Sequence, residues 1–242
     1  MGLPERLGSL LSLPLVGAGV LLLPGAVFSA GLGWRERRPV LPAALIWWLG
    51  YSLIYALLLP VTYQHGRYLM PAMPAYFLAG LAGAVELLAR WKGRGLLTRV
   101  VKKVWVGASA AVWLGFAVMG VFTYAGDVAI INTEMVKTAQ WVADELPGGA
   151  LVAAHDIGAL GYYGRHELVD LAGLISPEVI PFIRDEARLG RYLNERGVEY
   201  LVTFPGWYSD LTRGKAILYT SEGRYAPVAG GENMSVFRWS DP

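Results

Sequence analysis

Charge is divided unevenly along this chain of 242 residues, and the division limits what each half can fold into. Residues 1–126 contain eleven Lys and Arg, three Glu and no Asp, whereas the acidic residues outnumber the basic ones in residues 127–242. An apolar, basic segment without Asp is typical of a membrane domain, because carboxylates are costly in lipid. We therefore predict two domains, a membrane domain at 1–126 and a polar domain at 127–242.

Four uncharged runs in the first domain are each long enough to cross a bilayer, which takes about 20 apolar residues in a helix. They predict transmembrane helices at about 8–33, 40–63, 68–89 and 104–125. Basic residues cluster in the two loops that a four-helix arrangement places on one side, and the positive-inside rule makes that side cytoplasmic. The sequence thus predicts a multi-pass plasma-membrane protein with an extracytoplasmic C-terminal domain and no nucleic-acid partner.

In the polar domain, predicted strands alternate with predicted helices, a pattern typical of a small α/β domain with a partly parallel sheet. The strands are expected at 150–154, 167–170 and 198–204, with a closing hairpin at 225–229 and 234–239. A helix is expected at 132–146, with Asn132 as its N-cap, and two further helical segments are expected near 177–184 and 185–196.

The outward turn between the second and third predicted spans carries the most distinctive residues of the membrane domain. His65, Arg67 and Tyr68 precede a helix that begins at Pro71 and Pro74. An arginine at the membrane interface suits a phosphate, because its planar fork donates two parallel hydrogen bonds. The alternative is an interfacial anchor in which Arg67 binds lipid headgroups and Tyr68 joins the aromatic belt.

A basic residue followed by Tyr-Leu-x-Pro at the start of a late span resembles the membrane glycosyltransferases of the GT-C superfamily, which use polyprenyl-phosphate sugars. The protein O-mannosyltransferase-like and aminoarabinose-transferase-like groups belong to it. Arg67, Tyr68 and Pro71 match the pattern, and His65 is their neighbour. The resemblance implies that the turn lies beside the lipid-phosphate donor at the extracytoplasmic face. Residues 152–174, 200–205 and Trp207 resemble the soluble domain attached to many bacterial members.

The same resemblance also identifies a missing group. These enzymes carry a catalytic acid, usually Asp, in the first large external loop, but no Asp precedes Asp127 in this chain. The general base for an acceptor hydroxyl is therefore absent from the place where the family keeps it. We expect the chain to correspond to the C-terminal part of such an enzyme, with the N-terminal portion or a partner membrane subunit supplying the rest.

Two clusters in the polar domain follow predicted strands, at the edge where open α/β sheets often bind ligands. His155, Asp156 and Asp170, with Tyr162 and Tyr163 nearby, are candidates for an acceptor or carrier-headgroup site. His155 and Asp156 could also begin a metal site, although no cofactor is expected, and the glycine spacing departs from the dinucleotide-binding pattern. In the structural alternative, Asp156 caps a short helix and the tyrosines face the core or the membrane domain.

Two functional hypotheses follow. The first is the C-terminal part of an integral-membrane glycosyltransferase whose partners are membrane lipid and a polyprenyl-phosphate sugar. The second is a membrane-anchored binding or accessory module whose outward α/β domain recognises a partner or an envelope glycan. Glycines at Gly80 and Gly83 predict close helix packing in either case.

Overall fold

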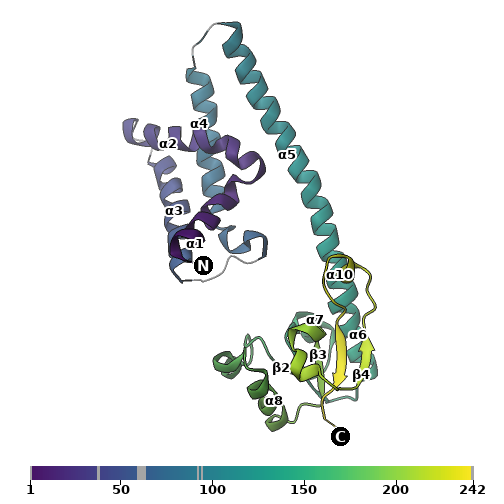
Figure 1. The fold of residues 1–242 in the computed structure, drawn as a ribbon. Coiled ribbons are helices and arrows are strands. Elements are labelled where there is room, and N and C mark those ends of the chain that lie inside the picture. Colours follow the sequence, from purple (N-terminus) through teal and green to yellow (C-terminus); the bar gives the residue numbers. More distant parts are fainter. Residues whose placement is uncertain (1, 37–38, 59–63, 92, 94, 241–242) are drawn as a thin grey trace. The chain divides into compact units, whose positions relative to one another are not determined.

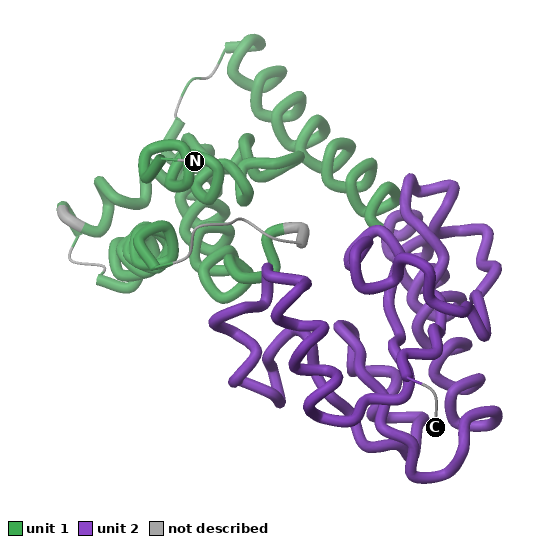
Figure 2. Tube along the Cα trace, turned by 60° about the horizontal axis from the view of Figure 1, so that its bottom comes forward, with its two compact units in different colours: residues 1–120 green, residues 121–242 purple. Residues whose placement is uncertain are grey.

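The computed structural model describes residues 2–36, 39–58, 64–91, 93 and 95–240; the side chains of Trp34, Gln64 and His65 lie outside this description. The chain forms two compact units, residues 1–120 and 121–242 (Figure 2). It is mostly helical, with a five-stranded mixed sheet in the second unit (Figure 1).

The first unit begins with two helical segments separated by a sharp bend. Its elements are α1 (Leu3–Ser12), η1 (Leu13–Leu15), η2 (Gly17–Leu22), α2 (Leu23–Arg35), α3 (Val40–Leu58), η3 (Gln64–Leu69), α4 (Met73–Arg90) and the first part of α5 (Leu96–Ile131), which ends in the second unit. The pair Leu3–Leu15 and Gly17–Gly33 is bent by 92°. Pro14 lies just before the bend, and Gly17 adopts a φ of 64°, which favours glycine. The span predicted at 8–33 thus contains a sharp bend in the structure.

Two described helices are long and apolar enough to cross a membrane, namely α3 and the helical run Leu96–Glu145. The bent pair makes a third if it counts as one span. The helix α4 does not meet this criterion, and its last turns carry Glu86 and Arg90. Length and composition thus support two or three spans rather than the predicted four. For the span predicted at 40–63, α3 ends at Leu58 and residues 59–63 lie outside the described residues.

The helices α2 and α4 cross at very short range (Figure 1). A Cβ atom added at Gly83 would lie 1.9 Å from the carbonyl oxygen of Gly25, and one added at Gly25 would lie 2.0 Å from that of Gly80. The Ser29 hydroxyl donates a hydrogen bond of 2.6 Å to the carbonyl oxygen of Ala79. Backbone therefore faces backbone at this crossing, as expected from the predicted small-residue packing.

The segment after α5 differs from its prediction. The helix continues through η4 (Asn132–Val136), a π-helical turn, into α6 (Lys137–Glu145). Asn132 therefore lies inside a helical run instead of capping a new helix, because the preceding residues remain helical up to Ile131. Extra-wide turns of this kind insert one residue into a helix and are frequent at functional or strained positions.

The sheet of the second unit has the order β2-β1-β3-β5-β4. Its strands are β1 (Leu151–Ala154), β2 (Glu167–Asp170), β3 (Tyr200–Thr203), β4 (Ile217–Thr220) and β5 (Ser235–Arg238). The strand β1 pairs in parallel with β2 and β3, whereas β5 pairs antiparallel with β3 and β4. The prediction of a partly parallel sheet is confirmed.

The predicted first arm of the closing hairpin is wrong. Residues 225–229 contain the short helix α10 (Tyr225–Val228), and the strand that pairs with β5 is β4 instead. Pro227 has no N–H to donate to a sheet, whereas the amide of Ala229 donates to the carbonyl oxygen of Tyr225 at 3.1 Å. A local helical bond thus replaces the expected strand pairing.

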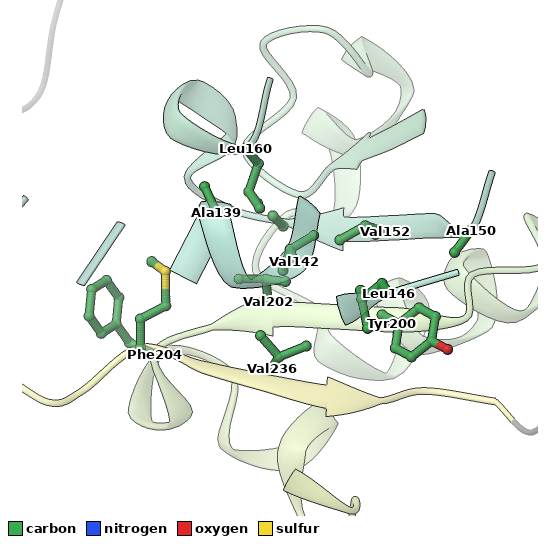
Figure 3. Packing of buried hydrophobic residues seen from close by; sticks show 12 residues of the cluster. Ala139, Val142, Leu146, Ala150, Val152, Leu160, Tyr200, Val202, Phe204 and Val236 are labelled. Atoms are coloured by element: carbon green, nitrogen blue, oxygen red, sulfur yellow. The ribbon is translucent and has the colours of Figure 1, made fainter. Parts of the chain in front are cut away.

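Helices cover both faces of the sheet. On one face, Ala139 and Val142 of α6 pack over Val152, Val202 and Val236 of the three central strands (Figure 3). The alternate residues of the same strands face the other side, where they pack with α8 (Glu186–Glu195) and its neighbours. This second cluster includes Ala153, Leu201, Phe237, Leu189 and Leu193. Burial on both faces explains why these strands read as continuous apolar runs.

Candidate functional site

The turn that holds Arg67 is fixed to the first unit by its neighbours. Leu69 in the same turn is completely buried, whereas Arg67 and Tyr68 are exposed. Arg67 donates a hydrogen bond from Nη2 to the Tyr68 hydroxyl at 2.8 Å, and its guanidinium carbon lies 4.7 Å from the centre of that ring. The guanidinium is thus held against the Tyr68 ring, and these two contacts restrict the conformations of the Arg67 side chain.

An aromatic row on α3 supports this turn. Trp47, Tyr51 and Tyr55 are four residues apart and share one helix face. The Tyr55 ring stacks on Tyr68 with centroids 5.5 Å apart, and the Tyr51 hydroxyl donates to the carbonyl oxygen of Tyr68 at 3.0 Å. The Trp47 indole donates to the carbonyl oxygen of Pro71 at 3.2 Å. Sequence reasoning missed this row, although its spacing was visible.

The remaining donors of Arg67 have no carboxylate partner within the part of the chain that the structure describes. Arg90, another cation near a predicted span end, differs in this respect. It pairs with Glu86 at 2.7 Å and with Glu36 at 2.5 Å. The guanidinium of Arg67 is exposed and already positioned, so it can bind an anion with little rearrangement of its side chain. His65 belongs to η3, but its side chain lies outside the described atoms.

In the second unit, the candidate residues gather at the carboxyl ends of the parallel strands. His155 and Asp156 directly follow β1, Asp170 is the last residue of β2, and Tyr208 lies in the segment that follows β3. Because these three strands are parallel neighbours, their ends meet at one edge of the sheet. The sequence prediction placed the first three residues there, but it did not include Tyr208.

His155 is bound to the segment after β3. Its Nδ1 lies 2.7 Å from the Tyr208 hydroxyl, and its ring is 5.0 Å from that of Trp207, nearly perpendicular to it. Burial, followed by the carboxylates of Glu186, Asp170 and Asp156, raises the pKa of Tyr208 to about 12. The phenol therefore stays protonated at neutral pH and can donate to the bare Nδ1 of a neutral imidazole.

Asp156 immediately precedes α7 (Ile157–Tyr163), at the N-cap position, but its side chain makes no capping hydrogen bond. Its side chain caps no backbone N–H, and its Oδ2 atom is buried without a hydrogen-bond partner among the described residues. Burial raises the pKa of this carboxyl, and the neighbouring His155 opposes the shift. The capping role proposed in the structural alternative is therefore not realised, and the site keeps an unsatisfied acceptor.

The carboxylate of Asp170 is hydrogen-bonded within its own loop. It is completely buried, and its two carboxylate oxygens accept hydrogen bonds from the amides of Ala172 at 2.7 Å and Ile175 at 2.8 Å. These bonds close the loop after β2 on itself. Its carboxylate is thus occupied by its own loop, whereas Asp156 beside it retains a buried oxygen without a partner.

Tyr162 and Tyr163 are exposed at the end of α7. Their rings contact each other at 4.8 Å, and 82% of Tyr162 is accessible to solvent. Within the described residues, neither ring bonds to or stacks on His155. The structure therefore brings His155 and Asp156 together with Tyr208 and leaves the two tyrosines at the surface.

A buried carboxylate that the sequence did not reveal lies in the π-helical turn. Glu134 is completely buried and accepts a hydrogen bond from the amide of Met234 at 2.9 Å. The Ser221 hydroxyl and the Asn233 amide also donate to it. All three donors come from the segment that connects β4 to β5, so Glu134 attaches that segment to the helix.

The described residues contain no group of three or more His, Asp or Glu side chains that could hold a metal ion. Residues 127–237 match the model of a family described as a domain of unknown function (DUF8728). The matched segment lies within the second unit and includes the sheet edge with His155 and Asp156. No curated protein and no solved structure matches the chain.

Proposed function

We propose that the chain is the C-terminal part of an integral-membrane glycosyltransferase that uses a polyprenyl-phosphate-linked sugar. The first unit contacts the lipid carrier, with the bent pair, α3, α4 and the apolar part of α5 as four membrane segments. In this proposal the turn at Arg67 and the second unit lie on the extracytoplasmic side. The single observation that carries the proposal is the exposed guanidinium of Arg67, held over Tyr68 without a carboxylate partner among the described residues.

A phosphate at the membrane interface suits this arrangement for two reasons. The guanidinium stays charged at physiological pH, and its fork matches two phosphate oxygens at once. The aromatic row of Trp47, Tyr51 and Tyr55 offers apolar ring surface beside the cation, against which the first isoprene units of a carrier can pack. A cation beside an apolar surface fits an amphipathic phospholipid better than a free inorganic anion.

Arg67 would act on the leaving group of the transfer. Cleavage of the sugar–phosphate bond leaves negative charge on the phosphate, and a positioned cation stabilises that charge as it develops. The complementary step, removal of the acceptor proton, needs a base, and no Asp occurs in residues 1–126 to provide one near this turn. The chain in this proposal binds the donor, while a further portion or subunit supplies the acceptor base.

Binding of the carrier tests the proposal directly. The full chain is placed in phosphatidylcholine nanodiscs and loaded with undecaprenyl phosphate, and native mass spectrometry measures the bound fraction. We expect Arg67→Ala to weaken binding about tenfold, because a charge-assisted bidentate contact is lost. Arg67→Lys should recover only part of this loss, because a point charge cannot reproduce the fork.

Two controls separate a phosphate site from general attraction. Arg99→Ala removes an exposed cation from α5 and should leave binding unchanged. Undecaprenol lacks the phosphate and should bind the parent chain and Arg67→Ala equally. Equal losses in Arg67→Ala and Arg99→Ala would reduce Arg67 to one of several lipid-facing cations, and the proposal would fail.

A membrane-anchored binding module is the second candidate function. One observation favours it, a pocket in the second unit lined by an exposed Trp207 and the carboxylate of Glu232. Such a module would bind a ligand there without any need for the carrier. Carrier binding that does not depend on Arg67, together with ligand binding at this pocket, is the outcome that would favour this function.

A further inference from the structure

A pocket of about 410 Å³ opens in the second unit between two segments that flank the sheet. One segment follows β3 and includes η6 (Pro205–Trp207), and the other connects α10 to β5. The lining includes two aromatic rings, three glycines and one carboxylate: Phe204, Trp207, Gly206, Gly230, Gly231 and Glu232. The rest of the lining is aliphatic and includes Ile130 of α5. Its volume lies within the range of small-molecule sites, about 300–1,000 Å³.

Trp207 provides a positioned aromatic surface in this pocket. Half of the residue is accessible, at 51%, although its ring contacts two others. Phe204, which is buried, lies 4.9 Å from it, and His155 lies 5.0 Å away. The indole is therefore held in place from behind while part of its surface remains open to a ligand.

The carboxylate of Glu232 is also positioned. Its Oε2 accepts a hydrogen bond of 2.6 Å from the amide of Gly206. A Cβ atom added at Gly206 would lie only 2.7 Å from Oε1, so the absence of a side chain there lets the carboxylate approach the backbone. One oxygen is fixed by this bond, which leaves Oε1 as an oriented acceptor at the pocket wall.

Part of the pocket wall is formed by glycine backbone. The Gly230 amide donates to the carbonyl oxygen of Pro227 at 3.0 Å, and the Gly231 amide donates to that of Ala226 at 2.8 Å. Gly230 adopts a φ of 82°, which an L side chain rarely takes. The turn after α10 is thus closed by its own hydrogen bonds and places no side chain at these two positions of the pocket.

We propose that this pocket binds a neutral pyranose sugar, with one face of the ring on Trp207 and its hydroxyls on Glu232. The C–H groups of a pyranose carry slight positive charge and suit the negative face of an indole. Its hydroxyls donate to a carboxylate, and the pocket volume admits a ring of this size. A quaternary ammonium ligand would instead be held in a cage of several aromatic faces, whereas Phe204 is 8% exposed and Trp207 is the aromatic residue of this pocket with a large open surface.

This site is separate from the Arg67 turn and does not depend on the proposed function. Both sites would serve a glycosyltransferase, but a sugar at Trp207 would equally fit an anchored glycan-binding module. The test therefore includes Arg67→Ala as a variant that leaves this pocket intact. Loss of carrier binding in that variant and loss of sugar binding in a pocket variant are independent outcomes.

The experiment measures sugar binding to the full chain in nanodiscs by saturation-transfer difference NMR. Methyl α-mannopyranoside, methyl β-glucopyranoside and N-acetylglucosamine are the probes. We expect at least one to bind, with transfer strongest at the C–H protons of one ring face. Trp207→Ala should weaken binding about tenfold, because a central aromatic anchor is removed. Glu232→Gln and Gly206→Ala should each weaken it severalfold, the second by displacing the carboxylate.

Matched controls keep the test specific. Tyr162→Ala removes an exposed aromatic ring of the same unit, and Glu145→Gln removes an exposed carboxylate; both should bind as the parent chain does. Amide spectra of Trp207→Ala report whether the sheet is intact, and Trp207→Phe, which keeps a smaller ring, should bind with intermediate strength. Three results would overturn the proposal: no transfer to any probe well above millimolar concentration, equal binding by Trp207→Ala, or displacement of the sugar by tetramethylammonium.

Discussion

The carboxylate of Glu134 accepts a hydrogen bond from the main-chain nitrogen of Met234, which lies 2.9 Å away. This bond joins a π-helical turn to the residue that immediately precedes β5. The same carboxylate receives the Ser221 hydroxyl, next to the end of β4. One buried side chain therefore holds the antiparallel end of the sheet to the helix that covers it.

We expect Glu134→Ala to lower the free energy of unfolding of the second unit by about 3 kcal/mol, because it leaves buried donors without an acceptor. Glu134→Gln, which keeps one acceptor, should cost roughly half as much. Hydrogen exchange of the β5 amides in the full chain measures the opening free energy. The exposed Glu145→Ala serves as the control, and an effect of Glu134→Ala no larger than this control would contradict the assignment.

Asp170 provides a second stability test, because its bonds to the amides of Ala172 and Ile175 close the loop after β2. Asp170→Ala should destabilise this loop by about 2 kcal/mol, the typical loss for a charge-assisted hydrogen bond. Faster exchange of these two amides, with little change in β3, would show a local effect. If exchange is unchanged, the carboxylate is free for a ligand, as the sequence-based hypothesis supposed.

The buried carboxyl of Asp156 predicts a pH dependence. Because burial raises its folded-state pKa, the folded protein holds this proton up to a higher pH than the unfolded chain does. The associated stability is present below the ordinary carboxyl pKa and is lost as pH rises through the raised value. Asp156→Asn should therefore be more stable than the parent chain at neutral pH, by about 1 kcal/mol, and lose this advantage in acid.

Hydrogen exchange of β1 between acid and neutral pH measures this difference in the full chain. The exposed Asp144→Asn is the matched substitution and should keep the pH dependence of the parent chain. A constant difference between Asp156→Asn and the parent chain over the whole pH range would contradict the assigned role of burial.

The membrane orientation can be tested with single cysteines, since the chain has none of its own. Arg213 is well exposed, whereas Ser221 is buried against Glu134 and would report poorly. We expect Arg213→Cys to react with an impermeant maleimide in intact cells and Arg99→Cys to react only after permeabilisation. The reverse pattern would place the α/β unit in the cytoplasm.

Local sequence patterns predicted much of the second unit. The strand at 167–170 matches β2, and the predicted strands at 150–154 and 198–204 contain β1 and β3. Short apolar runs bounded by turns favour such assignments, because strands buried on both faces have no polar alternation. The prediction at 225–229 was wrong because the segment is apolar, as a strand would be. Its backbone hydrogen bonds nevertheless form a short helix that contains a proline.

The candidate sites were predictable only in part. Parallel strands bring their carboxyl ends together, so the grouping of His155, Asp156 and Asp170 followed from strand order. Tyr208 and Glu134 acquire their roles from partners 53 and 100 residues away in sequence, and no local pattern encodes such contacts. The helical spacing of Trp47, Tyr51 and Tyr55 was present in the sequence, but its target at Tyr68 depended on the turn.

The crossing of α2 and α4 has a consequence for how the first unit can move. Where Gly25 and Gly83 meet, no side chain separates the two backbones, so there is no layer of rotatable groups that could absorb sliding. The two helices should then tilt together. We therefore expect a displacement at the start of α4, which follows the Arg67 turn, to move α2 by a similar amount and to reach the bend between Leu15 and Gly17.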